Sequence, residues 1–219
     1  MIHLRDRFAA SQRTVSCASR TARADVAYFA DASADDCRVV IGGWEAKPGA
    51  RTDQCRWFSL AVTPAHTPWF FSFGKGHQVI AASELLATTV CVALFAPDAP
   101  EGARGTLAVT SAYTDNRGNT YAAAKLHTTK FPLSCVVMEL AAQLEAKGLW
   151  LDLKWTPREQ NVHADALTNG RWERFDASLR VASDFSEVSF LVLPALLRAG
   201  AGRSRSPGCC AARRGALPP

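Results

Sequence analysis

Three features that would place a 219-residue chain in other classes of protein are missing from this sequence. No run approaches the ~20 consecutive apolar residues of a transmembrane helix, so no membrane contact is predicted. The seven cysteines are scattered, without a C-x-x-C pair or a cysteine–histidine cluster at zinc spacing. The odd number of cysteines and the lack of a signal peptide favour a reducing, intracellular compartment, either cytoplasm or nucleus. The Arg- and Ser-rich start of the chain leaves a transit peptide as the alternative.

Acidic residues are also missing from the C-terminal end, and this absence changes how the net charge of +5 is interpreted. Residues 197–219 contain five arginines and no acid, whereas residues 1–24 contain five arginines and one aspartate. The body of the chain, residues 25–196, therefore has a net charge of −4. A basic protein often binds nucleic acid, but a nucleic-acid site on an acidic body would need divalent metal ions to admit phosphate.

The composition, 48% apolar and 21% charged, predicts one globular domain that is large enough to bury a core. Strands are predicted at residues 26–30, 39–46, 56–63, 106–114 and 149–155. Helices are predicted at residues 78–95, 116–126, 132–147 and 161–168. An antiparallel meander of three strands is thus followed by alternating helices and strands. This order predicts an α/β fold with a mixed five-stranded sheet and helices on both faces.

The remaining regions are predicted to be less regular. Residues 1–24 are expected to form a loose Arg-rich arm, residues 171–199 a partly apolar extension, and residues 200–219 a disordered tail. Within the extension, residues 188–197 either pack on the body or bind a neighbouring domain. In the strand predicted at 39–46, the pair Gly42 and Gly43 indicates either a bulge or a close backbone approach. The aromatic residues of loop 64–77 are interpreted as core packing beneath the loop: Trp69, Phe70, Phe71 and Phe73.

Four carboxylates occupy comparable places in this order of elements. Asp31 ends the first predicted strand, Asp115 ends the fourth, Glu84 lies on the helix after the meander, and Asp165 lies on the last helix. If the first and fourth strands are neighbours, Asp31 and Asp115 lie side by side at the carboxyl edge of the sheet, where open α/β folds place their ligands. Asp115 also has a structural interpretation, because it, Asn116 or Asn119 could cap the following helix.

Glu84 is the one carboxylate in the predicted helix 78–95, which is apolar on nearly every face and should be buried. A buried unpaired charge is unfavourable, so Glu84 would need a partner, a metal ion or a route to solvent. Alternatively, Ser83 caps a helix that begins at Glu84, whose side chain would then lie without penalty in the first turn. The sequence leaves both interpretations open.

Five short motifs follow one another in a recognisable order: FADAS (29–33), GGW (42–44), SELLA (83–87), YTDN (113–116) and WTPREQNVHADAL (155–167). On these motifs the sequence resembles the ribonuclease H family, in particular the ribonuclease H domains of retroelement polyproteins. The resemblance implies a ribonuclease H-like domain over residues 25–170 and hydrolysis of the RNA strand of RNA–DNA hybrids. It also implies that the catalytic, metal-binding residues are Asp31, Glu84, Asp115 and Asp165.

The implied cofactor is a pair of Mg²⁺ ions, and Mn²⁺ could replace them. Cations would offset the repulsion between clustered carboxylates, and Mg²⁺ prefers oxygen ligands. Two such ions can clamp the attacking and leaving oxygens of an in-line displacement. On the resemblance, Asp31 would bridge both ions, Asp165 would hold the ion that activates water, and Glu84 and Asp115 the other. Three residues are candidates for contacts to the 2′-hydroxyl groups of the RNA strand: Ser33, Asn116 and Asn119. The alternative for each is a structural role in a turn or a helix cap.

The sequence departs from the family pattern in two ways. Many members have a mobile histidine after the fifth strand, whereas here the nearest, His163, lies inside a predicted helix and is interpreted as an exposed helix residue. No polymerase signature occurs, so a reverse transcriptase domain is expected as a partner and not as part of the chain. Two other functions stay open: another nuclease of the same superfamily, and a non-catalytic module that binds nucleic acid or a polymerase without metal.

Overall fold

The computed structural model describes residues 23–34, 38–71, 79–98 and 108–195. The predicted tail at 200–219 and nearly all of the predicted arm at 1–24 lie outside these ranges. Arg23, which the arm was predicted to include, already belongs to the first strand. In the described ranges, no helix has both the length and the apolar character needed to cross a membrane.

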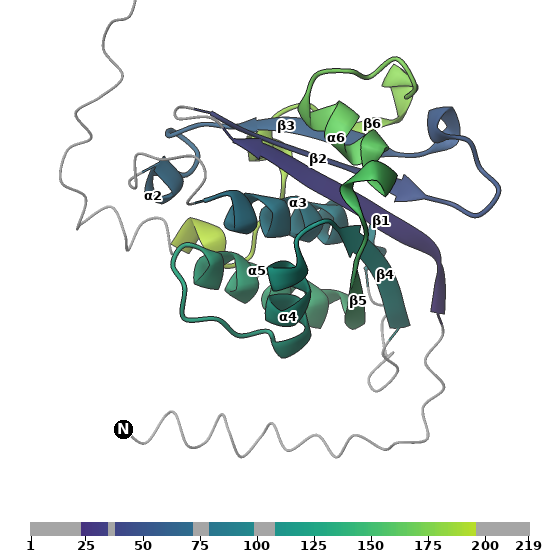
Figure 1. Cartoon of the computed structure of the whole chain (residues 1–219). Coiled ribbons are helices and arrows are strands. Elements are labelled where there is room, and N and C mark those ends of the chain that lie inside the picture. Colours follow the sequence, from purple (N-terminus) through teal and green to yellow (C-terminus); the bar gives the residue numbers. More distant parts are fainter. Residues whose placement is uncertain (1–22, 35–37, 72–78, 99–107, 196–219) are drawn as a thin grey trace, which may run out of the picture.

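A mixed sheet of six strands, in the order β5-β4-β1-β2-β3-β6, forms the centre of the structure (Figure 1). β1, β2 and β3 pair antiparallel, while β4 pairs parallel with β1 and β5 parallel with β4. The strands span Arg23–Ala34 (β1), Val39–Ala46 (β2), Trp57–Val62 (β3), Ala108–Thr114 (β4), Leu149–Trp155 (β5) and Arg180–Ala182 (β6). The predicted α/β architecture, a meander followed by alternating helices and strands, is therefore confirmed.

The prediction of five strands was wrong by one, because β6 adds a short strand parallel to the edge strand β3. Three residues are too few to show an alternating pattern, so no local signal marks β6 in the sequence. Tertiary contacts hold it in place: Arg180 donates from Nη2 to the carbonyl oxygen of Ser59 at 2.6 Å, and its guanidinium lies over the rings of Trp57 and Trp172.

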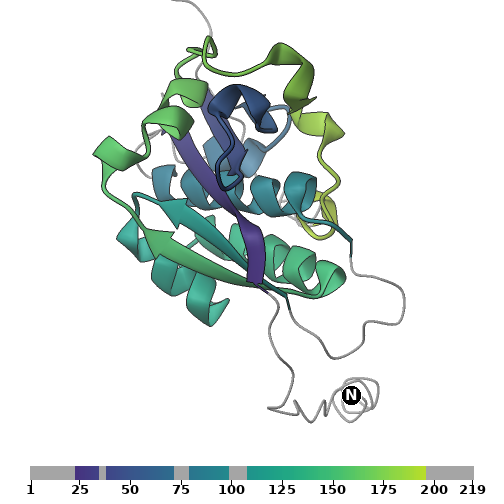
Figure 2. The ribbon, with the colours of Figure 1, turned by 90° about the vertical axis from the view of Figure 1, so that its right-hand side faces the viewer.

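Helices cover both faces of the sheet, as predicted (Figure 1, Figure 2). One face carries α3 (Ile80–Phe95), α4 (Arg117–Lys125) and α5 (Leu133–Lys147), and the other carries the short α6 (Val162–Thr168). α3 is buried along most of its length, as its apolar sequence indicated. The predicted loop 64–77 contains a four-residue helix, α2 (Pro68–Phe71), in which Phe71 packs against the core. The side chains of Trp69, Phe70 and Phe73 lie outside what the structure describes.

The glycine pair in β2 permits helices to approach the sheet closely from both sides. A Cβ on Gly42 would lie 2.8 Å from the Cβ of Leu167 on α6, and a Cβ on Gly43 would lie 2.5 Å from the Sγ of Cys91 on α3. The pairing of β2 with β1 and β3 shows no shift of register at these residues. Of the two interpretations from sequence, the close approach is correct and the bulge is wrong.

The segment after Arg171 packs on the same body, with Val188 and Leu193 in the main hydrophobic core. Its anchor is Glu139, a carboxylate on α5 with 0% exposure. Glu139 accepts hydrogen bonds from three consecutive backbone N–H groups, those of Leu191, Val192 and Leu193, at 2.7–2.9 Å. Gln143 Nε2 donates a fourth at 2.8 Å. Of the two alternatives for this segment, packing on the body is therefore observed over its described part.

Replacing Glu139 with alanine should strongly destabilise the protein, because three backbone N–H groups at the core would lose their acceptor. We expect the free energy of unfolding, measured by urea denaturation, to fall by about 2–4 kcal/mol. Glu139→Gln should have a stability between those of the parent and Glu139→Ala, because its amide oxygen still accepts hydrogen bonds. Glu145→Ala, at an exposed position on the same helix, is the matched control and should change stability by less than about 0.5 kcal/mol. Equal losses in the two alanine variants would show that Glu139 is not an anchor.

Candidate metal centre

The parallel pairing of β1 and β4 brings two aspartates together at one edge of the sheet. Phe29 pairs with Tyr113 in the parallel register, so Asp31 and Asp115 each lie two residues beyond this pair. Asp115 directly follows β4, as predicted, but Asp31 does not end β1. β1 continues to Ala34 because it stays paired with β2, where Asp31 lies opposite Gly42.

Glu84 joins these aspartates from α3. The helix begins at Ile80, and the hydroxyl of Ser83 donates to the carbonyl oxygen of Val79 at 3.0 Å, so Ser83 is not a cap. The interpretation that placed Glu84 in the first turn after a Ser83 cap is thus wrong. Asp31, Glu84 and Asp115 each offer one ligand oxygen, and these three oxygens lie within 4.8 Å of one another. We call these three residues the carboxylate triad.

Asp115 does not cap the following helix, because Asn116 does. The Oδ1 atom of Asn116 accepts hydrogen bonds from the backbone N–H groups of Gly118, at 2.9 Å, and Asn119, at 3.3 Å. The Oδ1 atom of Asp115 is buried and has no hydrogen-bond partner within the described residues. A buried carboxylate oxygen without a donor is what a bound cation would satisfy.

The electrostatics of the triad agree with its geometry. Burial, followed by the negative charges of Asp115 and Asp165, raises the pKa of Asp31 to about 7, against a hydrogen bond from the backbone of Ala32. Burial, together with the charges of Asp115 and Asp31, also raises the pKa of Glu84 to about 7, against a hydrogen bond from Asn116. The metal-free triad therefore holds protons that a divalent cation would displace.

Asn119 has a different place from the one predicted for a substrate contact. It is only 1% exposed, and its Nδ2 donates to the carbonyl oxygen of Ala81 at 2.9 Å and to Oε2 of Glu84 at 3.4 Å. Its side chain therefore faces α3 and Glu84 and presents almost no surface to a ligand. We revise its predicted role from contacting substrate to positioning Glu84. Asn116 is half-buried and Ser33 is exposed, so both remain candidates for substrate contact.

Asp165 lies on α6, on the other side of the sheet from α3, and is not one of the triad. Its charge nevertheless acts on Asp31, so it lies nearby. α6 is held there by the close approach at Gly42 and by Asn161, whose Nδ2 donates to the carbonyl oxygen of Ala30 at 3.1 Å. Asn161 occupies the N-cap position predicted for it but makes no side-chain cap bond.

Two arginines that were not predicted as site residues hold the carboxylate of Asp165. Arg171 Nη2 lies 2.7 Å from its Oδ2, and Arg158 Nη2 lies 3.4 Å from its Oδ1. Arg158 belongs to the motif WTPREQNVHADAL, whereas Arg171 lies just beyond the predicted domain end at residue 170. Neither contact follows from spacing along the sequence alone.

His163 is half-buried, so its interpretation as an exposed helix residue was wrong. Its ring meets those of Trp44 and Phe175 edge to face, at centroid distances of 5.6 and 6.3 Å. Burial, followed by the charge of Arg174, lowers the pKa of His163 below its ordinary value. Phe175 comes from the segment after α6, and no sequence pattern indicates that this segment returns to cover α6.

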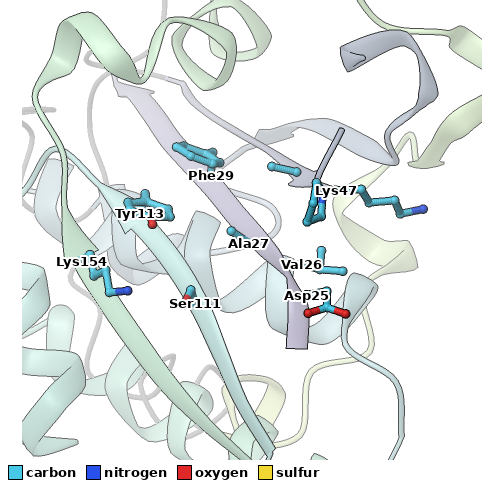
Figure 3. A pocket seen from close by; sticks show the side chains of 10 residues that line it. Asp25, Val26, Ala27, Phe29, Lys47, Ser111, Tyr113 and Lys154 are labelled. Carbon is cyan, nitrogen blue, oxygen red and sulfur yellow. The ribbon is translucent and has the colours of Figure 1, made fainter. Parts of the chain in front are cut away.

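Two hollows on the surface include none of the triad residues. The larger, of about 470 Å³, lies on the open face of β1, β4 and β5 around Phe29, Tyr113 and Lys154 (Figure 3). The smaller, of about 310 Å³, is lined by Ser33, Arg38 and other residues around the end of α6. We place the candidate site at the triad and not in the larger hollow, which includes none of the four predicted acids.

Comparison with known proteins gives likenesses in structure alone. No family model matches the chain, and no curated protein matches it. An RNase H1 from the halophilic archaeon Halobacterium salinarum is similar in structure, with 16% identity, a TM-score of 0.45, and coverage of 69% of this chain and 98% of the other. An RNase H1 called LC11, solved in complex with an RNA/DNA hybrid, has 15% identity, a TM-score of 0.48, and coverage of 66% and 94%.

The N-terminal RNase H domain of a Mycobacterium tuberculosis protein is also similar, with 15% identity, a TM-score of 0.45, and coverage of 66% and 96%. At such identities and TM-scores, a likeness does not carry an activity from one chain to another. The chemistry of this chain is therefore argued from its own residues.

The residues present fit a divalent cation. The triad offers carboxylate oxygens, which hard cations such as Mg²⁺, Mn²⁺ and Ca²⁺ prefer, and no sulfur or imidazole ligand belongs to the cluster. Its charges repel one another, the pKa values of Asp31 and Glu84 are raised, and one of its buried oxygens has no donor. The site is therefore suited to hold a divalent metal ion.

Without metal, the protein should become less stable as the pH rises from about 5 to about 8. The raised pKa values of Asp31 and Glu84 contribute stability that is fully present below their ordinary values near 4 and is lost as the pH approaches 7. Unfolding in urea with EDTA should show this loss of stability. Glu84→Gln should reduce the loss, because the amide has no proton to give up as the pH rises. Above about pH 7, Glu84→Gln should be more stable than the parent.

Glu145→Gln, at an exposed position, is the control and should leave the pH dependence of stability unchanged. Adding Mg²⁺ at high pH should restore the stability of the parent far more than that of Glu84→Gln. Parallel pH profiles for the parent and Glu84→Gln would contradict the electrostatic description of the triad.

Proposed function

We propose that the protein is a metal-dependent endonuclease that hydrolyses the RNA strand of RNA–DNA hybrids. The observation that carries the proposal is the carboxylate triad, which β1, α3 and β4 bring within 4.8 Å at one edge of the sheet. Asp165 lies near enough on α6 to act on the charge of Asp31. Three acids from separate elements thus form the cluster and a fourth, Asp165, acts on it from α6, and their motifs are those that resemble the ribonuclease H family.

The proposed cofactor is Mg²⁺, with Asp31, Glu84 and Asp115 as its ligands and Asp165 as a further one. Bound Mg²⁺ would supply Lewis acidity for phosphodiester hydrolysis and lower the pKa of a coordinated water. The negative charges of both Asp115 and Asp165 act on Asp31. This supports the role of shared ligand that the resemblance implies for Asp31.

Other residues of the chain hold the carboxylates of the triad in place. Asn119 donates to Glu84, which restricts the rotamers that the carboxylate can adopt. Trp155 Nε1 donates to the backbone carbonyl oxygen of Asp115 at 3.0 Å, which fixes the residue directly after β4. These contacts preorganise the triad, so that little reordering is needed when a cation enters.

Recognition of the RNA strand is proposed to come from Ser33 and Asn116, through its 2′-hydroxyl groups. Ser33 is exposed two residues beyond Asp31 on the same strand, and Asn116 directly follows Asp115. The motif W-T-P-R-E-Q-N-V-H-A-D-A-L supports a retroelement origin, with a reverse transcriptase domain as the natural partner. The alternative is a non-catalytic module that binds a partner through the segment around residues 188–197. Residues 188–193 pack on α5 of the same chain and so give this alternative no support.

Cleavage of an RNA–DNA hybrid labelled on each strand in turn tests this function. We expect the parent to cut the RNA strand alone in Mg²⁺, and Asp115→Asn to lose at least about a hundredfold in rate, because it removes a ligand carboxylate. Asp98→Asn is the matched control, with the same change at an exposed position beyond the far end of α3, and it should cleave like the parent.

A folded parent that leaves the hybrid intact in both Mg²⁺ and Mn²⁺ would contradict catalysis by this chain. Cleavage that persists in Asp115→Asn would show that the activity arises elsewhere or from a contaminant. Cutting of the DNA strand, or of duplex DNA at the same rate, would favour another nuclease of the same superfamily.

A further inference from the structure

Asp165 is held by two guanidinium groups instead of lying with the triad. Arg171 binds its Oδ2 at 2.7 Å and Arg158 faces its Oδ1 at 3.4 Å, so both oxygens of one carboxylate have an arginine partner. The charge of Arg158 also acts on Asp31, Glu84 and Asp115. Arg158 therefore lies near the triad, with its side chain largely in solvent.

Both arginines are accessible and their backbones are fixed. Their side chains are 74% exposed for Arg158 and 60% exposed for Arg171, against 24% for Asp165. Gly170, with φ of +71°, ends α6, and the N–H of Arg171 then donates to the carbonyl oxygen of Ala166 at 2.9 Å. This turn places Arg171 beside Asp165, while a short 3-10 turn, Arg158–Gln160, carries Arg158 on the other side.

A carboxylate and a phosphodiester present the same feature to arginine, an anionic pair of oxygens. We infer that Arg158 and Arg171 form a binding site for a backbone phosphate of the nucleic acid, and that Asp165 occupies this site in the free protein. The inference rests on the proposed function, since it takes the substrate to be a polyphosphate strand. It adds a phosphate-binding site beside the carboxylate triad.

Replacement of Asp165 by a phosphate at the two arginines would change the surroundings of the triad. A phosphate that takes the two guanidinium groups releases the carboxylate of Asp165 beside Asp31, on whose charge it already acts. The fourth acid would then become available only when a strand is present. In the structure three acids form the cluster while Asp165 is paired with arginines, which is the arrangement from which this exchange would start.

Binding of a fluorescein-labelled RNA–DNA hybrid in EDTA, followed by fluorescence anisotropy, tests the inference without any cleavage. Asp165→Asn should bind the hybrid roughly three- to tenfold more tightly than the parent, because the arginine pair loses its internal anion. Glu173→Gln, which removes one negative charge from an exposed position in the same segment, is the control and should gain less than about twofold.

The gain should depend on the arginine and not on net charge. Adding Arg171→Ala to Asp165→Asn should remove most of the gain, whereas adding Arg174→Ala, three residues along at an exposed position, should retain it. Circular dichroism would confirm that each variant is folded.

Three results would overturn the inference: equal gains in Asp165→Asn and Glu173→Gln, a gain that survives Arg171→Ala, or no binding of the hybrid by either the parent or Asp165→Asn. Failure of the proposed function is seen separately, as a folded parent that binds the hybrid in EDTA but does not cleave it in Mg²⁺.

Discussion

The parallel pairing of β1 with β4 is the constraint on which the rest of the structure depends. It places Asp31 and Asp115 next to each other and partly out of water, where their negative charges repel. Such an arrangement lowers stability unless protons or cations compensate it. The chain therefore maintains an unfavourable cluster at the carboxyl edge of the sheet, and a fold does so when the cluster binds something.

The surrounding elements hold this cluster from both faces of the sheet. On one face, α3 presents Glu84, and Asn119 of α4 fixes it. On the other, α6 comes close because β2 has no side chain at Gly42, and Asn161 ties the helix to β1. The segment that follows α6 then returns across the molecule, where Glu139 anchors it to α5. The acids are thus carried by separate elements whose spacing is fixed by glycine, amide and carboxylate contacts, which suits a site that must be preorganised.

Much of this arrangement could be predicted from sequence because it depends on local patterns. Apolar and β-branched runs marked most of the strands, alternation marked residues 149–155, and the strand-to-helix junction placed Asp115 at the sheet edge. The parts that could not be predicted depend on tertiary contacts. β6 has three residues and is held by Arg180, and β1 extends past Asp31 because of its pairing with β2.

The errors within the site have the same origin. An asparagine near the start of a helix can cap the helix at the surface or be buried, and the sequence does not distinguish the two. Only the packing of α4 on α3 shows that Asn119 is buried against Glu84. Arg171 meets Asp165 through a turn at Gly170, six residues along the chain but adjacent in space. His163 is covered by Phe175, from a segment whose sequence shows little regular pattern. Local propensity contains no information about such contacts between elements.

We propose that Asp31, Glu84 and Asp115 together bind a divalent metal ion. Diffraction from crystals of the protein grown with Mn²⁺, measured at the manganese absorption edge, would test this binding. We expect an anomalous peak within bonding distance, about 2.2 Å, of an oxygen from each of the three carboxylates. A well-ordered triad without a peak, or a peak bound by other residues, would contradict it.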